Sequence, residues 1–243
     1  MSALLDAKTA VSQGSRILSA QGVSDAFGHL SCRSPERSDR FLIPRSLAPG
    51  LVTPDDVVEL DLAGDLIGPN PGVKLFLERF IHGEIYRRRP DVQAVVHSHA
   101  LPVVPFTVVQ GAKLRPICHM CGFLRGAPTT FDLAVHAGPS TDLLIRDAEL
   151  GRHLAEHLGE ASVVLMRSHG YTVVGANVPE AVFQAIYTMK NCEIELAARV
   201  LGEPAFLSTG EAEASARTLG IATARAWELW LRQCPPIEAV ISA

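Results

Sequence analysis

The stretch Asp91–Ala100, DVQAVVHSHA, sets the constraint from which the fold follows. Its apolar run has the length and composition of a buried strand, which we expect over residues 92–99. This strand ends in His97 and His99, one residue apart. Residues i and i+2 of a strand project from the same face, so the two imidazole rings are expected side by side. Two ring nitrogens at this spacing can bind one metal ion, and the strand end is therefore a candidate metal site.

A second expected strand, residues 161–170 (ASVVLMRSHG), also ends in a histidine. His169 is followed by Gly170, which permits a sharp exit and a close approach of another backbone. Because ligands collect where the strands of open α/β sheets end, we expect His169 to join the other two histidines. The helix expected over residues 75–88 carries Glu78 and leads directly into the histidine strand, so Glu78 can come near the metal. Three histidines that leave one position open are typical of a catalytic zinc site.

The rest of the chain alternates helical and strand patterns. Apolar spacing and turn residues predict helices over residues 3–21, 147–159 and 178–202 and strands over residues 29–34, 40–46 and 53–62. Residues 211–234 are expected to form a helix pair or one broken helix. Strands separated by helices predict an α/β protein with a three-layer α/β/α arrangement. Without a repeat or a linker, residues 1–243 are predicted to be a single domain.

Composition points to a small partner. The chain has 243 residues, 47% of them hydrophobic, and a net charge of -4, which argues against nucleic acid or an anionic membrane as a partner. No apolar run approaches the roughly 20 residues that span a bilayer. The early Asp6 and the lack of an apolar h-region argue against a signal peptide, and the scattered cysteines are expected to be reduced. We therefore expect a cytoplasmic protein.

On these motifs the sequence resembles the class II aldolase/adducin family, which includes metal-dependent sugar-phosphate aldolases and epimerases. The resemblance covers roughly residues 8–235 and is carried by GHLSCR (28–33), VTPDDVVELDLAG (52–64), LERFIHGEIYRRRPDVQAVVHSHA (77–100) and RSHGYTVVGANVPEA (167–181). It implies a central, mostly antiparallel sheet and a homo-oligomer, often a tetramer. It also implies His97, His99 and His169 as metal ligands, with Glu78 as the acid/base carboxylate.

The positions at which this sequence differs from the sugar-phosphate members are ones expected to bind the substrate. Those members have Gly-Asn in the first motif, where this chain has Gly28-His29. Their phosphate-binding Thr-Pro-Ser-Gly turn is replaced by IPRS, with Arg45 and Ser46, and a Ser-Ser pair is replaced by VKLFLE, with Lys74. Because phosphate cradles use small hydroxyl residues and free N–H groups, we expect a carboxylate substrate held by Arg45 and Lys74. The alternative is a surface arginine and a solvated loop lysine.

Two further positions have candidate roles. The aldolases carry an HYM element whose tyrosine donates a proton, whereas this chain has CHM, which leaves His119. His119 is a candidate proton donor or a residue that caps a turn. Tyr171, directly after His169-Gly170, is expected to support the substrate site or simply to pack. The combination GHLS, IPRS and CHM is similar to the branch of decarboxylases that act in aromatic-ring breakdown, on dihydroxyphthalate or carboxylated hydroxymuconic semialdehydes.

The sequence therefore predicts a lyase, a metal-dependent decarboxylase of a hydroxylated aromatic or ring-cleavage carboxylic acid, working through a metal-stabilised enolate. His29, Arg45, Ser46, Lys74 and Tyr171 are expected to bind substrate. Glu78 or His119 is expected to deliver the proton. Zinc is the expected metal, although manganese, cobalt or iron would also fit. The alternatives are a retro-aldolase or epimerase for a non-phosphorylated hydroxy-oxo compound and a non-catalytic, adducin-like binding module.

Overall fold

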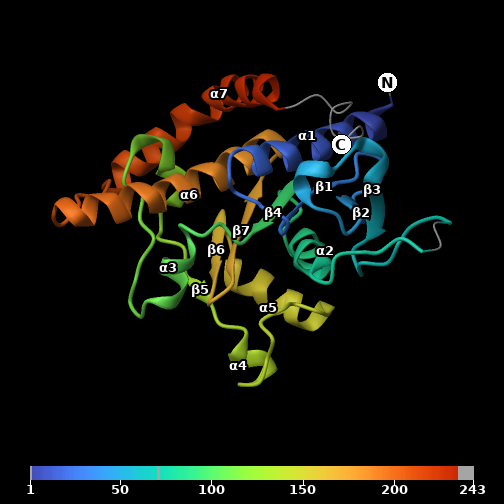
Figure 1. Ribbon diagram of the computed structural model, residues 1–243, viewed down its shortest axis with the longest axis horizontal. Coiled ribbons are helices and arrows are strands. Elements are labelled where there is room, and N and C mark those ends of the chain that lie inside the picture. The colour runs from blue at the N-terminus through green and yellow to red at the C-terminus, as the bar shows by residue number, and fades with distance from the viewer. Residues whose placement is uncertain (1, 70–71, 235–243) are drawn as a thin grey trace.

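The computed structural model describes residues 2–69 and 72–234, and residues 1, 70–71 and 235–243 of the predicted domain lie outside that description. A seven-stranded sheet crosses the described residues in the order β3-β2-β1-β4-β7-β6-β5 (Figure 1). The strands are β1 (His29–Arg33), β2 (Arg40–Pro44), β3 (Val57–Asp61), β4 (Ala94–Ser98), β5 (Thr130–Phe131), β6 (Val163–Met166) and β7 (Gly170–Gly175). Only the β5–β6 pair is parallel, which confirms a mostly antiparallel sheet.

Helices cover both faces of the sheet and confirm the three-layer arrangement. In Figure 1, α1 and α6 lie on one side with α7 packed outside α6, and α2 and α5 lie on the other side. The helices are α1 (Ala3–Ala20), α2 (Arg79–Arg88), α3 (Val104–Val108), α4 (Ala134–Ala137), α5 (Ala148–Leu158), α6 (Val178–Leu201) and α7 (Thr209–Gln233). Within the described ranges, no helix is both long and apolar enough to cross a membrane.

Alternation along β4 defines the two faces on which the cores form. Val96 packs in the core under α1 and α6, whereas Val95 packs with Ile81 of α2 on the opposite face. Successive side chains of a strand point to opposite faces, so His97 falls on the face covered by α2. The central strand of the sheet therefore presents its histidine beneath the N-terminal end of α2.

The strands beside β4 place two more polar groups on that face. His29 of β1 is the register partner of His97, and Thr172 of β7 is its partner on the other side. Directly opposed residues of antiparallel strands project to the same side, so the three side chains are neighbours. A Cβ at Gly170 would overlap the carbonyl oxygen of Ser98, which confirms that this glycine permits the close backbone approach.

Three element boundaries differ from the sequence prediction. Helix α2 begins at Arg79 rather than residue 75, because the preceding segment is tied to the loop after β2 by a hydrogen bond from the Ser46 N–H to the Lys74 carbonyl, at 2.7 Å. Strand β7 was not expected: the predicted strand over residues 161–170 covers β6, which ends at Met166, and Gly170 is instead the first residue of β7, the second strand of this hairpin. The last described residues form one continuous helix, α7. The long helix α6 keeps its predicted Pro179 start and Gly202 end.

Candidate metal centre

The three predicted histidine ligands converge on one point. The Nε2 atom of His97 lies 2.9 Å from that of His99 and 3.2 Å from that of His169, and the remaining pair is 2.9 Å apart. Three nitrogens bound to one tetrahedral ion at about 2.0–2.1 Å would lie roughly 3.3 Å from one another. The rings also meet at steep angles, 77° and 75° from the plane of His97. This arrangement fits three ligands of a single cation.

Glu78, which is the residue just before α2, completes the cluster. Its Oε2 atom lies 3.5 Å from the Nε2 of His97 and 3.4 Å from that of His169. Its other carboxylate oxygen, Oε1, accepts a hydrogen bond from the backbone N–H of Ile145 at 3.0 Å. One ligand atom from each of the four residues lies within 4.8 Å of all the others. Glu78 can therefore touch a bound cation or a substrate beside it.

The far ring nitrogens of two histidines also have partners. The Nδ1–H of His169 donates to the carbonyl oxygen of Leu143 at 2.7 Å, and Nδ1 of His97 lies 3.2 Å from the hydroxyl oxygen of Thr172. Such contacts fix the tautomer that turns the Nε2 lone pair toward a metal. The donor set, with imidazole nitrogens and one carboxylate, fits a divalent cation such as zinc.

The backbone around His169 is held in an uncommon conformation. Ser168, which precedes it, has a φ of +56°, and Leu143, which accepts its proton, has a φ of +66°. Non-glycine residues rarely adopt positive φ, and such conformations gather at functional sites, where the surrounding structure maintains them. Both residues fix the position of this one ring.

Burial and mutual proximity set the protonation of the cluster. Burial alone would raise the pKa of Glu78, but the adjacent His97 and His169 lower it well below its usual range. Burial, followed by the neighbouring imidazoles, lowers the pKa of His99 to about 3. Burial also lowers the pKa of His97, whereas Glu78 overcomes the effect of burial at His169 and raises that pKa. Above the raised pKa of His169, the cluster presents an ionised carboxylate and three unprotonated imidazoles, the state that binds cations.

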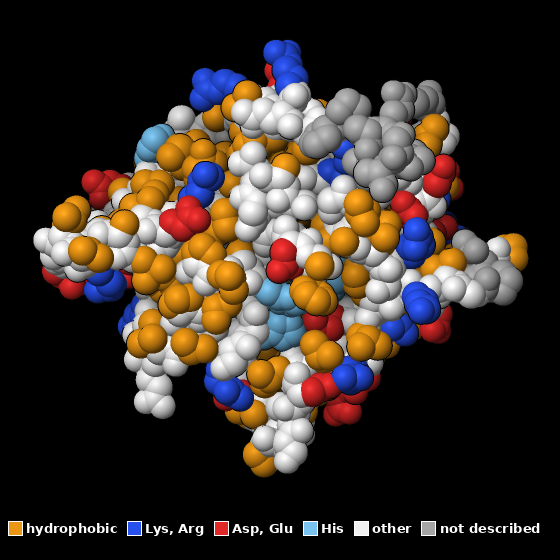
Figure 2. Space-filling model, viewed as in Figure 1, with side chains coloured by type: hydrophobic (Ala, Val, Ile, Leu, Met, Phe, Trp, Pro, Cys, Tyr) orange, Lys and Arg blue, Asp and Glu red, His pale blue; other side chains and the backbone are white. Residues whose placement is uncertain are grey.

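A cavity of about 420 Å³ opens beside the cluster and is lined by both Glu78 and His99. His29 and Ser46, two of the residues predicted to contact substrate, add polar groups to its wall. The remaining wall is largely apolar and includes Phe27, Leu47, Phe76, Leu77 and Leu144. Figure 2 shows histidine side chains near the middle of this face, with hydrophobic side chains around them. The cavity suits a flat or apolar molecule with a polar end at the histidines.

The structure does not bring the two predicted cations to this cavity. Nε of Arg45 donates to Oδ1 of Asp56 at 2.8 Å, and the arginine side chain is 45% exposed. Lys74 is exposed to solvent and does not line the cavity. Asp56, eleven residues further along the chain, thus holds Arg45. The alternative of a surface arginine and a solvated lysine describes the geometry better.

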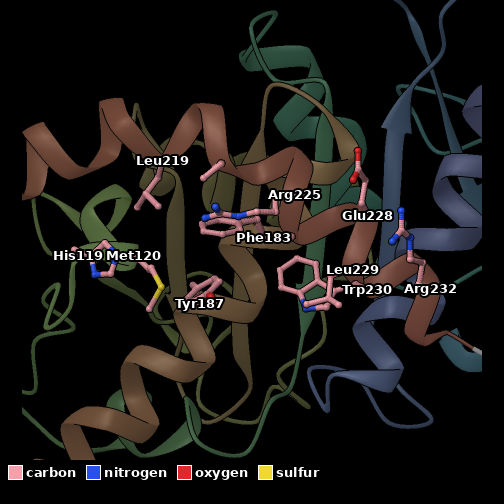
Figure 3. A pocket seen from close by; sticks show the side chains of 12 residues that line it. His119, Met120, Phe183, Tyr187, Leu219, Arg225, Glu228, Leu229, Trp230 and Arg232 are labelled. Carbon is pink, nitrogen blue, oxygen red and sulfur yellow. The ribbon is translucent and has the colours of Figure 1, made fainter.

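Tyr171 and His119 are also placed elsewhere. Tyr171 lies on the opposite face of the sheet, because it alternates with Thr172, and its buried hydroxyl donates to the carbonyl of Ala185 at 2.9 Å. His119 lines a second cavity of about 480 Å³ between α6 and α7, together with Phe183 and Trp230 (Figure 3). Within one chain, neither residue reaches the cluster.

The sequence did not reveal several residues that support the site. Leu143 and Ile145 hold His169 and Glu78 through backbone atoms, which leave no mark on residue type. Ser31 and Tyr86 lie behind His29 and His82 in a buried hydrogen-bonded chain. Strand alternation could have placed Ser31 on the face of His29, but its partners come from α2 and required the tertiary structure.

Comparison with known proteins agrees with this fold. The family model for the class II aldolase and adducin N-terminal domain matches residues 10–196. The chain belongs to this family.

Among individual relatives, it is similar to decarboxylase tropJ of Talaromyces stipitatus, with 42% identity over 90% of this chain and 91% of that protein. It is also similar to the 3,4-dihydroxyphthalate decarboxylase of Arthrobacter keyseri, with 31% identity over 74% of this chain and 73% of that enzyme.

The structure of L-fuculose 1-phosphate aldolase from Glaciozyma antarctica PI12 superimposes with a TM-score of 0.77, covering 97% of this chain and 90% of that one. At 24% identity, that similarity speaks for the fold alone.

Proposed function

We propose that this protein is a metal-dependent decarboxylase of a hydroxylated aromatic or ring-cleavage carboxylic acid. The observation that carries the proposal is the convergence of His97, His99, His169 and Glu78 at the end of an apolar cavity. The relatives named as decarboxylases support the same reaction type. Zinc is the cation we expect first, and manganese, cobalt or iron(II) would also be accommodated by this donor set.

When bound, the cation would act as a Lewis acid and draw electron density from a substrate oxygen. The chain's own residues orient the substrate. Phe27 and Phe76 line the cavity and offer apolar surface to a ring, and His29 and Ser46 offer polar contacts to its oxygens. The apolar walls also limit the access of water to the reacting carbon.

Decarboxylation breaks one carbon–carbon bond, and the bonding pair stays on the carbon that loses CO₂. That carbon must then take up a proton. Glu78 lines the cavity as an ionised carboxylate, so we assign it two linked transfers: it first accepts the proton of the substrate's hydroxyl group and then delivers that proton to this carbon. His119, the other predicted proton donor, lines the cavity between α6 and α7 in the same chain and has no part in the proposal.

The test is CO₂ release from ortho-hydroxy aromatic acids, beginning with 3,4-dihydroxyphthalate, by protein of measured metal content. We expect turnover that a chelator abolishes and that added zinc, manganese, cobalt or iron(II) restores. Equal CO₂ release by metal-free protein would contradict the proposal. An aldehyde product without CO₂ would instead indicate a retro-aldolase. Protein that purifies without stoichiometric metal and turns over none of these acids would indicate a binding module.

We also propose that the protein assembles as a homo-oligomer, with a tetramer expected. Light scattering on the purified protein gives the assembly mass directly, and a monomeric mass at micromolar concentration would contradict it.

A further inference from the structure

A chain of buried polar groups runs from the cavity into the protein behind His29. Nδ1 of His29 lies 2.6 Å from Nε2 of His82, and Nδ1 of His82 lies 2.6 Å from the hydroxyl oxygen of Ser31. The Ser31 oxygen in turn lies 2.7 Å from the phenol oxygen of Tyr86. Four side chains from β1 and α2 therefore form one continuous hydrogen-bonded line that begins at the cavity wall.

The inner part of this line is closed to solvent. His82 and Ser31 are 0% exposed, and Tyr86 is 1% exposed. The ring of Phe41 packs on His82 at 6.2 Å and on Tyr86 at 5.6 Å between ring centroids. A buried polar atom without a partner is costly, so each link must hold one proton between its two atoms. All hydrogen bonds of the line must therefore run the same way, with every group donating either toward His29 or toward Tyr86.

Tyr86 selects between the two directions. Burial raises the pKa of its phenol well above the usual value, so the hydroxyl keeps its proton. Within the described part of the chain, the Ser31 hydroxyl is the side-chain partner of this group. A buried O–H that donates to no acceptor is costly. The phenol must therefore donate its own proton to Ser31.

The direction at Tyr86 fixes every later link. Ser31 accepts from Tyr86 and so donates to Nδ1 of His82. His82 then carries its proton on Nε2 and donates it to Nδ1 of His29. A neutral imidazole that accepts at Nδ1 carries its own proton on Nε2. His29 is thereby left with an N–H on the ring atom that takes no part in the buried line.

We propose that this line holds His29 as its Nε2–H tautomer and that His29 donates from Nε2 to an anionic oxygen of the substrate in the cavity. His82, Ser31 and Tyr86 act as positioning residues. The His29 ring lines the cavity and lies between Phe76, at 4.6 Å, and His97, at 5.1 Å between centroids. The substrate class is an oxyanion, a carboxylate or phenolate, because the opposite tautomer would direct a lone pair at it. The substrate contact rests on the proposed function; the tautomer does not.

The tautomer can be observed directly. In protein labelled with ¹⁵N-histidine and held near pH 8, the protonated and bare ring nitrogens differ in chemical shift, and His29→Gln identifies the signals of His29. We expect the proton of His29 on Nε2. In Tyr86→Phe, Ser31 loses its donor and both directions become open, so an Nδ1–H population of His29 should appear. The matched control is Tyr171→Phe, which also removes one buried tyrosine hydroxyl and should leave the His29 signals unchanged.

A bare Nε2 in the wild-type protein overturns the proposal. An unchanged His29 in Tyr86→Phe overturns the role of Tyr86. Both results are independent of any substrate, so they separate this inference from the proposed reaction, whose failure would show only as absent CO₂ release.

Kinetics then test the donor. Glutamine places its amide nitrogen near the position of a histidine Nε2, whereas asparagine reaches only the position of Nδ1. We expect His29→Gln to keep CO₂ release within about tenfold of wild type and His29→Asn to lose about a hundredfold, the range carried by hydrogen bonds to charged groups. Tyr86→Phe should lower kcat/KM by about two- to tenfold. The opposite order of the two His29 variants would overturn a donor at Nε2.

Discussion

Two groups of histidines in this molecule differ in how their rings meet. The central cluster consists of His29, His82, His97, His99 and His169. The surface trio consists of His136, His153 and His157, and the rings of His136 and His157 contact Phe131. In the central cluster the ligand rings meet at 50° to 77° and direct their Nε2 atoms to one point. In the surface trio, His136 and His153 stack with centroids 4.0 Å apart and planes 19° apart.

Ring orientation decides which group can bind a metal. A metal bound by imidazole lies along a nitrogen lone pair, and hence in the plane of the ring. Two stacked, nearly parallel rings cannot share such an ion, although they pack on each other and His136 also packs on Phe131. The surface trio also lacks a converging carboxylate, because Glu156 lies 3.6 Å from His153 alone. Residue type is thus the same in both groups, and the backbone that aims the rings makes the difference.

The largest expected effect comes from removing one ligand ring of the central cluster, and the matched control removes one ring of the surface trio. His97→Ala should lose bound metal and reduce CO₂ release at least about a thousandfold, since even partners behind a ligand cost 10- to 100-fold. His136→Ala is the matched control, and we expect wild-type metal content and turnover. Metal content by elemental analysis and initial rates measure both. Equal losses in the two variants would erase the distinction between the groups.

Glu78 provides the next largest effect, because the surface trio has no counterpart to it. Glu78→Gln keeps the volume but removes the charge and the acid/base function, and we expect turnover to fall about 10²- to 10³-fold. Glu195→Gln is the control: this carboxylate is also buried, at 1% exposure, but pairs with Arg199 on α6. Initial rates at equal metal content should separate the two. Full activity in Glu78→Gln would exclude this carboxylate from proton transfer.

The third effect is on stability in acid, measured on metal-free protein. Burial, followed by the charge of His97, lowers the pKa of His82 to about 3 from its ordinary 6.5. The unfolded chain therefore binds a proton first, and the stabilisation is complete above pH 6.5 and is lost as the pH falls toward 3. Between pH 6.5 and pH 5 this amounts to about 2 kcal/mol.

His97 and His99, whose pKa values burial also lowers, act with the same sign as His82. His169 acts with the opposite sign, because Glu78 raises its pKa and its contribution grows as the pH falls. Urea denaturation at both pH values gives the net change in unfolding free energy. His82→Gln should remove part of that change, and His157→Gln, at a less buried ring whose pKa burial also lowers, should remove less of it. A wild-type profile that is flat from pH 6.5 to pH 5 would contradict a buried, neutral His82.

The contrast also explains how far the sequence could predict the site. His97 and His99 follow from strand alternation, and His169 follows from a strand end with a glycine behind it, since both are local patterns. These histidines come together because β7 lies between β4 and β6 in the sheet. No separate pattern in the sequence predicted β7 or its hairpin with β6. Glu78 was expected inside a helix and instead precedes it, because its position depends on the loop after β2 and the Ile145 amide.

Four predicted site residues lie away from the cavity within one chain, and they share one physical cause. Arg45, Lys74, His119 and Tyr171 were assigned roles from residue type at a motif position. Their side-chain directions depend on partners elsewhere, such as Asp56 for Arg45 and Ala185 for Tyr171. A local pattern predicts the face of an element well, but it does not predict which distant group a long side chain will bind.

Arg45 resembles the surface trio in this comparison. Its guanidinium could bind a substrate carboxylate, but its side chain does not point toward the cavity. Its guanidinium is half exposed and bound to Asp56, and exposed ion pairs of this kind stabilise by about 0–1 kcal/mol. Arg45→Gln should keep kcat/KM within about threefold of wild type and barely change the unfolding midpoint. The comparison variant is His29→Asn, whose ring lines the cavity and whose loss we expect to be about a hundredfold. If Arg45→Gln instead raised KM a hundredfold with kcat unchanged, the arginine would leave Asp56 to bind the substrate carboxylate. The cavity would then close around its ligand with the guanidinium that Asp56 holds in this structure.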